Sequence, residues 1–367
     1  MSKSSCKAVF VYGTSAELIK IWPVIEALKE TMSLQLLSAN QQPHELRILE
    51  DRLDIGPVTH LRDPNKPNLT NKLEVPLWAI RVLLSSLFHI LRTRVKGQKA
   101  FVLVHGDTMT SVIGAVAGKV SFSKVVHIEA GLRSHDWRNP FPEEINRIIT
   151  ARLAHYHFAP TQEALKNLSN RRGIKIDTHG NTSIDSMRKM SEKLSTTNVH
   201  QTYCLVSLHR AELLANVTVL RETISELITV SRKHRLVMVI DALTRETLLA
   251  LDLQNELLSS SIKIFEKMPY PDFLQLVIES HCIVTDSGGL QEEAGFLSKR
   301  CLVHRRATER DDGIGTTSKL SMWESGAISQ FIEVAMNEPS EISTVPKVDG
   351  FSPTAIIAER LTQDCCK

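Results

Sequence analysis

The chain has 367 residues, which is too long for one ordinary hydrophobic core and fits two domains of common size. Its 44 lysines and arginines nearly balance 41 aspartates and glutamates, leaving a formal net charge of +3. This charge is too small and too dispersed for a nucleic-acid surface, so nucleic acid is not expected as a partner. An anionic ligand would have to be held by a few local groups.

The N-terminus predicts a soluble, cytoplasmic protein. A short polar lead runs directly into an apolar strand, without the long apolar core and cleavage site of a signal peptide. The most hydrophobic segment, residues 75–91, is interrupted by Arg81 and His89 and predicts an amphipathic helix instead of a membrane span. No membrane partner is therefore expected.

The six cysteines show neither a CxxC pair nor metal-finger spacing. We expect them to be reduced thiols of a cytosolic protein, with Cys204, Cys282 and Cys301 in buried strands. No metal site is predicted from them.

Short β-branched runs alternate with helix-length amphipathic stretches, as in βαβ units with a parallel sheet. A polar stretch at residues 178–197 separates two such series. The sequence therefore predicts an α/β fold of two Rossmann-like domains facing a central cleft, with residues 1–177 in the first domain and 178–351 in the second. Strands are expected at residues 8–12, 34–38, 100–104 and 125–129, and then at 203–208, 236–241, 262–266, 282–286 and 300–303.

Carboxylates lie at the ends of neighbouring strands in the first half. Asp107 follows one predicted strand, Glu129 ends the next, and Glu143 lies in the first turn of a helix predicted to begin at Pro142. Each has an ordinary structural explanation, such as the preference for acidic residues at a helix N-terminus. Because ligands of open parallel sheets bind beyond the strand ends, the three together predict an acid–base set on one rim.

The segment TDSGGLQEE, residues 285–293, places a serine and two glycines between a strand and a predicted helix. Glycines let a phosphate approach the backbone, and free N–H groups at a helix N-terminus favour an anion. Ser287, Gly288 and Gly289 are thus candidates for diphosphate binding. The alternative is a plain helix start capped by Asp286 or Ser287.

Two other segments of the second half carry candidate phosphate ligands. His209 and Arg210 end a predicted strand, where an imidazole can protonate a leaving phosphate. Residues 305–313 cluster three arginines with acidic residues, a mixture more typical of solvated surface. GxGxxG, GxxxxGK[ST] and HExxH motifs are absent, which removes the main support for nicotinamide, P-loop and zinc-protease functions.

In order and context these motifs resemble the non-hydrolysing UDP-N-acetylglucosamine 2-epimerases over nearly the whole chain. The matching segments are GTSAELIKIWPVI (13–25), GDTMT (106–110), HIEAGLR (127–133), PFPEE with NR (140–147), HFAPT (157–161), GNT with ID (180–185) and TDSGG with QEE (285–293). The resemblance implies a glycosyltransferase-B-like fold, with a C-terminal helix at 352–367 that packs back on the first domain.

The resemblance also implies an activity and a set of roles. UDP is eliminated across carbons 1 and 2 to give a 2-acetamidoglucal, and is then added back with the opposite face at carbon 2. A UDP-sugar substrate, no cofactor, no metal, a homodimer and a role in cell-surface polysaccharide biosynthesis are implied. The implied acid–base residues are Asp107, Glu129, Glu143 and His209, and the implied substrate-binding residues are Lys20, Arg133, Arg210, Phe273, Ser287, Gly288, Gly289, Glu293 and Arg310.

Three segments depart from the family pattern. Ser15 stands where the family has a phosphate-binding arginine, and HRAEL replaces HRREN, so Ala211 replaces a second arginine. SANQQPH, residues 38–44, replaces the TGQH segment, which with HRREN belongs to the allosteric pocket of the bacterial enzymes. We expect the altered chain to lack activation by its own substrate.

Other functions remain open at this point. A hydrolysing 2-epimerase would release the free sugar, but its members resemble EGG where this chain has EAGLR. A sugar transferase of the same fold is disfavoured by the paired Glu129 and Glu143 motifs. Ser15 and Ala211 keep open a UDP-sugar-binding protein without turnover.

Overall fold

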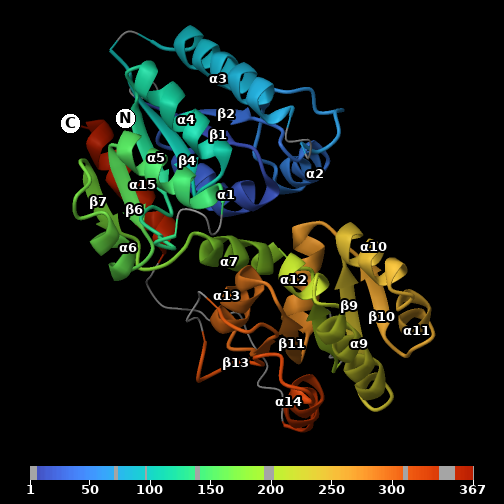
Figure 1. The fold of residues 1–367 in the computed structure, drawn as a ribbon. Coiled ribbons are helices and arrows are strands. Elements are labelled where there is room, and N and C mark those ends of the chain that lie inside the picture. Colours follow the sequence, from blue (N-terminus) through green and yellow to red (C-terminus); the bar gives the residue numbers. More distant parts are fainter. Residues whose placement is uncertain are drawn as a thin grey trace. The chain divides into compact units, whose positions relative to one another are not determined.

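The computed structural model describes residues 6–69, 73–95, 97–136, 141–193, 202–308, 313–338 and 352–366. The chain divides into two compact units. Unit 1 contains Met1–Lys189 and Gly350–Lys367, and unit 2 contains Met190–Asp349. Figure 1 shows the elements of each unit in chain order.

Unit 1 is built on a parallel sheet with the strand order β3-β2-β1-β4-β5-β6-β7. The first strand, β1, is buried along its whole length, as expected for a parallel strand covered on both faces. The strand order reverses between β1 and β4, which makes their carboxyl ends the switch point where such sheets bind ligands. The strands are β1 (Cys6–Tyr12), β2 (Ser33–Ser38), β3 (Val58–His60), β4 (Lys99–His105), β5 (Lys124–Ile128), β6 (Tyr156–Ala159) and β7 (Ile174–Asp177).

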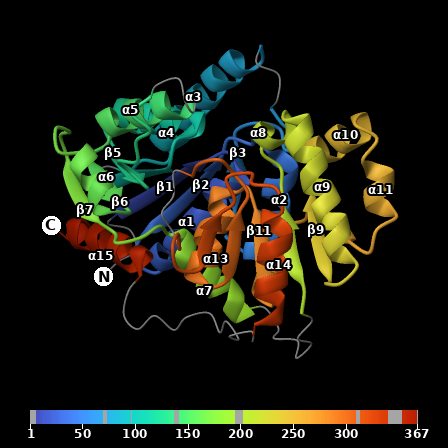
Figure 2. The same cartoon turned by 60° about the horizontal axis from the view of Figure 1, so that its bottom comes forward.

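Helices cover both faces of this sheet. In Figure 2, α3, α4 and α5 lie on one side of the strands, and α1 and α15 lie on the other. Val9, Val11, Val102 and Val104 of the strands pack with helix residues in one of the buried clusters. The helices are α1 (Ser15–Leu28), α2 (Pro43–Leu53), α3 (Val75–Arg92), α4 (Met109–Val120), α5 (Glu143–Leu153), α6 (Gln162–Asn167), α7 (Ser183–Lys193) and α15 (Pro353–Cys366).

Unit 2 repeats this plan with the parallel order β10-β9-β8-β11-β12-β13, and its switch point lies between β8 and β11. Its core combines strand residues such as Val206, Met238 and Val284 with apolar residues of α9 and α14. Its elements are β8 (Cys204–Ser207), α8 (Ala211–Leu214), α9 (Val217–Ser231), β9 (Leu236–Ile240), α10 (Ala242–Ala250), α11 (Gln254–Leu258), β10 (Lys263–Glu266), α12 (Tyr270–Glu279), β11 (Cys282–Thr285), α13 (Gly288–Phe296), β12 (Arg300–Val303), β13 (Ser318–Leu320) and α14 (Ala327–Asn337).

The predicted fold class, two α/β units each with a parallel sheet, is confirmed. All nine predicted strands form. Four further strands were not predicted: β3, β6, β7 and β13, which have three or four residues each. The division between units falls after Lys189 and not after Asp177. The reason is that the first turns of α7 bond within unit 1, where Ser186 Oγ donates to the carbonyl of Ile19 at 2.6 Å.

Helix α3 forms where an amphipathic helix was predicted, but its outer face is not polar. Trp78, Val82 and Ile90 are buried against the unit, and Trp78 Nε1 donates to the carbonyl of Ala39 at 3.1 Å. By length and composition α3 is the one helix of the described residues that could cross a membrane. Its buried residues Trp78 and Val82 pack with Ala39 and Ile113, so we interpret it as part of unit 1.

The prediction that all six cysteines are reduced is wrong for one pair. A disulfide joins Cys6, at the start of β1, to Cys365, in the last turn of α15. The two residues are 359 positions apart, and Figures 1 and 2 show their two elements side by side. Cys204, Cys282 and Cys301 are buried free thiols in strands, as predicted, and Cys366 is exposed and outside the disulfide.

Loss of this disulfide is expected to lower the free energy of unfolding by about 2 to 5 kcal/mol, because the bond closes a very long loop of the unfolded chain. Denaturant unfolding of the Cys6→Ser/Cys365→Ser protein, compared with wild type under non-reducing conditions, measures the loss. Cys366→Ser is the control and should unfold like wild type. Peptide mapping that finds a free Cys6 in a fully stable wild-type protein would contradict the pairing.

Candidate active site

The loop after β1 packs closely against α4 at the switch point of unit 1. A Cβ on Gly13 would lie 2.3 Å from Oγ1 of Thr110, so glycine is required at this position. Thr14 is the N-cap of α1, and its Oγ1 accepts a hydrogen bond from the N–H of Glu17 at 3.2 Å. The chain therefore enters α1 in a fixed geometry.

Glu17 ties the loop after β1 to the loop after β4. Its carboxylate accepts the backbone N–H groups of Gly13 and Thr14, both at 2.9 Å, and the hydroxyl of Thr108 at 2.6 Å. Burial raises the pKa of Glu17. The spacing Thr14-x-x-Glu17 signals a capping box, but the bond to Thr108 cannot be read from it.

Glu129 lies just after β5 with a left-handed backbone, φ +62°, which is unusual for a residue other than glycine. Its carboxylate contacts Lys20 Nζ at 3.0 and 3.1 Å and Asn181 Nδ2 at 2.6 Å. His105 Nε2 lies 3.2 Å from Oε2, and burial lowers the pKa of His105 to about 4, so this ring is neutral at pH 7. The predicted acid–base residue is thus held on several sides.

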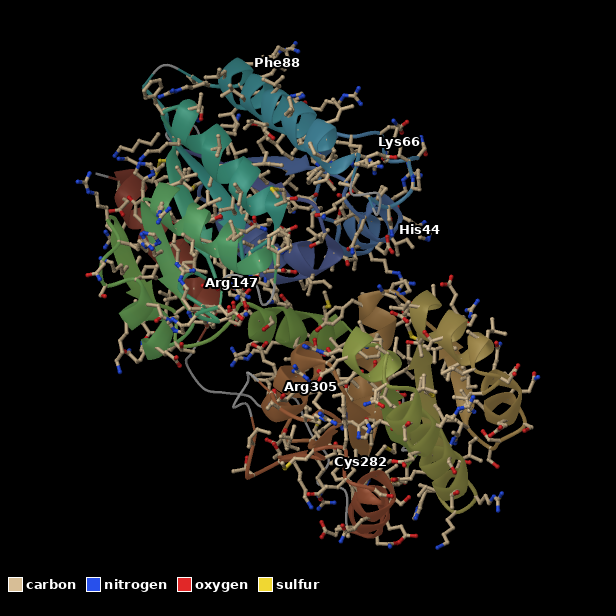
Figure 3. All side chains as sticks on the ribbon, viewed as in Figure 1. His44, Lys66, Phe88, Arg147, Cys282 and Arg305 are labelled. Carbon is tan, nitrogen blue, oxygen red and sulfur yellow. A yellow bond between two sulfur atoms is a disulfide. The ribbon has the colours of Figure 1, made fainter. Side chains whose placement is uncertain are left out.

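Asp107 follows β4 and is held by the first turns of α5. Arg147 forms a short ion pair with its carboxylate, and Asn146 Nδ2 donates to its carbonyl at 2.8 Å. Arg147 is labelled in Figure 3. These two residues belong to the matching segment PFPEE with NR (140–147), but no role was predicted for them from the sequence.

Glu143 and Glu144 are the first two residues of α5 and behave differently. Glu144 is buried, accepts the N–H of Ser134 at 3.2 Å and pairs with Arg147 at 3.4 Å. Glu143, the residue predicted to be catalytic, has a buried Oε2 without a hydrogen-bond partner among the described residues. The structure thus leaves an acceptor of Glu143 available, whereas Glu144 is engaged in holding the loop.

The two cations predicted to bind substrate in unit 1 contact carboxylates of the protein. Lys20 pairs with Glu129, as described above. Arg133 is partly buried and lies 3.8 Å from the carboxylate of Glu144, and this burial lowers its pKa. In this structure both side chains therefore organise the acidic residues of unit 1.

The loop after β8 in unit 2 is anchored by Asp286, which follows β11. The fully buried carboxylate of Asp286 accepts the N–H of His209 at 3.0 Å and the N–H of Arg210 at 2.8 Å. The imidazole of His209 lies 3.6 Å from the same carboxylate and is 41% exposed. Both predicted residues therefore lie at the switch point, and Asp286, mentioned only as a possible cap, holds them there.

Ser287 is the N-cap of α13, and its side chain accepts the N–H of Leu290 at 3.4 Å. Gly288 and Gly289 form the first turn. A Cβ on Gly289 would meet only Ser287 Oγ, at an ordinary 3.8 Å, so packing within the protein does not require glycine there. Since glycine is unfavourable in a helix, its presence fits a backbone that must leave room for a ligand.

Two other predicted ligands of unit 2, Phe273 and Glu293, lie on α12 and α13. Phe273 lies half-buried on α12, and on the same helix Tyr270 donates its hydroxyl to Glu293 Oε1 at 2.8 Å. Thr308 donates to Gln291 Oε1 at 2.9 Å. Arg310 lies outside the described residues. Tyr270 was missed, because only the folded chain brings it to Glu293.

Ser15, one of the replaced family positions, has a local partner. The N–H and hydroxyl of Ser15 both donate to Gln42 Oε1, at 3.2 and 3.1 Å, so two of the altered segments contact each other. Thr14, the residue before Ser15, caps α1. Ala211 begins the short helix α8. Among the described residues, no group of three or more His, Cys, Asp or Glu side chains is arranged to hold a metal ion.

Comparisons with known proteins agree on one family. The family model described as UDP-N-acetylglucosamine 2-epimerase matches residues 30–356. A UDP-N-acetylglucosamine 2-epimerase of Methanococcus maripaludis is 33% identical over 86% of this chain and 87% of its own length. One of Bacillus subtilis is 30% identical over 97% of this chain and 95% of its own length.

Solved structures of the same kind of enzyme superpose on the chain. The UDP-GlcNAc 2-epimerase of Methanocaldococcus jannaschii matches with a TM-score of 0.78 and 28% identity, covering 97% of this chain and 99% of its own. That of Neisseria meningitidis, crystallised with UDP-GlcNAc, gives 0.77 and 27%, covering 97% and 100%. The chain belongs to the UDP-N-acetylglucosamine 2-epimerase family, a family of isomerase enzymes.

Proposed function

We propose that the protein inverts carbon 2 of UDP-N-acetylglucosamine or a modified relative, giving the manno epimer with its UDP retained. The observation that carries this proposal is the set of carboxylates at the switch-point end of the sheet of unit 1, where Glu129 and Asp107 are each held by a cation. The capped, glycine-rich N-terminus of α13 in unit 2 suits a diphosphate. Membership of the family supports the substrate.

The proposed reaction is an elimination followed by an addition. Departure of the diphosphate oxygen from carbon 1 develops positive charge there, which makes the hydrogen on carbon 2 easier to remove. A carboxylate takes that proton, giving a 2-acetamidoglucal and UDP. UDP then adds to carbon 1 while a proton is added to carbon 2 on the opposite face. The two steps together involve no net oxidation, so the proposed reaction needs no redox cofactor.

The proposed roles follow the predicted residues. Asp107, Glu129 and Glu143 transfer protons, and the partly exposed imidazole of His209 assists the leaving diphosphate. Ser287 and the N–H groups of Gly288 and Gly289 hold the diphosphate. Further substrate contacts are proposed for Lys20, Arg133, Arg210, Phe273, Glu293 and Arg310.

Proton NMR of UDP-N-acetylglucosamine incubated with the protein in deuterated water tests the function. The expected product is the manno nucleotide sugar with deuterium at carbon 2. Release of free sugar and UDP would identify a hydrolysing 2-epimerase instead. No change, with UDP binding retained in calorimetry, would identify a binding protein without turnover.

The outer face of α3 supports a homodimer as the assembled form. Its exposed apolar side chains recur at spacings of three and four residues, as along a helix–helix seam, and Figure 3 shows Phe88 on this outer side. Arg94 donates to the carbonyl of Ser121 at 2.6 Å, which brings exposed Val120 and Phe122 next to the end of the helix. The outward residues of α3, which we call the α3 stripe, are Leu77, Ile80, Leu84, Phe88 and Leu91, each 48 to 61% exposed.

A second copy of the chain is the proposed occupant of the α3 stripe. An apolar band along a helix about 27 Å long is large for a free surface, and an identical band on a second copy can cover it symmetrically.

Leu84→Glu/Phe88→Glu should therefore convert a dimer into a monomer in light scattering, with the fold retained. Leu249→Glu, at an equally exposed position of α10, is the control and should remain dimeric. A monomeric wild type would contradict the dimer, and binding of that monomer to lipid vesicles would assign the α3 stripe to a membrane.

Location and pathway remain predictions from the sequence and the resemblance. We propose that the protein is cytoplasmic and acts in cell-surface polysaccharide biosynthesis. Disulfides are rare in a reducing cytosol, so the Cys6–Cys365 bond gives the location a direct test. Cell fractionation, with alkylation of free thiols at lysis, should show where the protein resides and whether this bond is formed there.

A further inference from the structure

Of the contacts to the Glu129 carboxylate described above, that of Asn181 is the shortest, and no role was predicted for Asn181 from the sequence. Its Nδ2 donates to Glu129 Oε1 at 2.6 Å, and its side chain is buried. Its Oδ1 accepts the N–H of Ser183 at 3.3 Å, which fixes the orientation of the amide with the NH2 group toward Glu129. The contact is thus a directed donor on a carboxylate.

The segment that carries Asn181 is held from two directions. Ser186 Oγ donates to the carbonyl of Ile19, the residue before Lys20, at 2.6 Å. Asp185 accepts the N–H of Thr354 at 2.8 Å and the hydroxyl of Ser352 at 2.9 Å, at the start of α15. Asn181 is therefore fixed relative to both Glu129 and Lys20, as a group that orients another must be.

Lys20, His105 and Asn181 differ in what they supply to the Glu129 carboxylate. Lys20 supplies a positive charge that contacts both oxygens. His105 is neutral at pH 7 and lies against Oε2. Asn181 alone among these three adds a neutral, directed N–H to Oε1. It can hold the plane of the carboxylate without competing for the proton that the carboxylate accepts.

We propose that Asn181 is a positioning residue for the epimerisation, which fixes the Glu129 carboxylate through its Oε1 so that the group meets the hydrogen on carbon 2 in one orientation. This inference rests on the proposed function. A misplacement of a reacting group by about 1 Å can cost roughly a hundredfold in rate. Loss of the amide should therefore affect turnover and not the binding of UDP.

The test compares Asn181→Ala, Asn181→Asp and wild type in kcat, KM and the pH dependence of kcat. Asn181→Ala should lower kcat by roughly tenfold to a hundredfold, with KM within about threefold of wild type. Asn181→Asp places a second carboxylate beside Glu129. Because a like charge disfavours the ionised form, the acidic limb of the kcat profile should move to higher pH by about one unit or more.

Asn167→Asp is the matched control, because Asn167 Nδ2 donates at 3.0 Å to a backbone carbonyl, that of Gly131, and not to a carboxylate. It should leave the acidic limb in place. An unmoved limb in a folded, active Asn181→Asp protein would overturn the role of Asn181. If that variant does not fold, Asn181→Ala decides, and an unchanged kcat overturns the role. A wild type that epimerises no UDP-sugar would instead overturn the proposed function.

Discussion

Replacing Glu129 by glutamine is expected to lower turnover by about a hundredfold to ten-thousandfold, the usual contribution of general acid–base catalysis. The glutamine side chain has the same shape as glutamate, and its amide oxygen can still accept a hydrogen bond from Lys20, but it cannot take a proton from carbon 2. The proposed diphosphate-binding groups lie in unit 2, so calorimetry should find UDP affinity unchanged. The same result is expected for Asp107→Asn and Glu143→Gln.

The control for these variants is Glu163→Gln, which removes an exposed carboxylate in the first turn of α6. It should turn over like wild type. Near-normal turnover of any one of the three variants would remove that residue from the proton-transfer set. A loss of UDP affinity equal to the loss of turnover would show that the carboxylate binds substrate instead.

Much of the fold was predictable, because most strands are continuous apolar runs long enough to recognise. The missed strands are short or partly polar. In β3, the segment Val58–His60 is neither buried nor uniformly apolar and is a strand because it pairs with β2. In β13, Ser318–Leu320 similarly pairs with β12. Pairing with a neighbouring strand is a tertiary contact, which a local pattern does not contain.

The candidate site was predictable where a residue type and a strand end coincide, as at Asp107, Glu129 and Ser287. The residues that hold them were not. Asn181 contacts Glu129 although the two residues are 52 positions apart in the sequence, and Lys20 contacts it from 109 positions away. No sequence pattern around Asn181 or Lys20 indicates a contact with Glu129. Only the folded chain therefore reveals how the Glu129 carboxylate is oriented.

The disulfide was missed for a related reason. Nothing in the spacing of Cys6 and Cys365 indicates a pair, because they lie near opposite ends of the chain. They meet because α15 packs beside α1 and the first strand, with Ile357 and Leu361 buried. Cysteine pairing over such a distance follows from the topology and not from the motif.

Asp286→Ala is expected to lower the free energy of unfolding of unit 2 by about 2 to 5 kcal/mol. The fully buried carboxylate accepts the backbone N–H groups of both His209 and Arg210, and each polar group left without a partner costs about 1 to 3 kcal/mol. The loop after β8 would then lose its anchor. Since His209 is the proposed phosphate-assisting residue of that loop, UDP affinity should fall by about tenfold, which corresponds to about 1.4 kcal/mol.

Asp241→Ala is the matched control, because Asp241 also follows a strand of the same sheet but only caps α10, accepting the N–H of Thr244 at 2.8 Å. Loss of this cap should lower the free energy of unfolding by about 1 kcal/mol and leave UDP affinity unchanged. Denaturant unfolding and calorimetric titration of UDP measure both variants against wild type. If Asp286→Ala matches Asp241→Ala in both measurements, the carboxylate is only another local cap, and the loop that presents His209 is held by its own contacts.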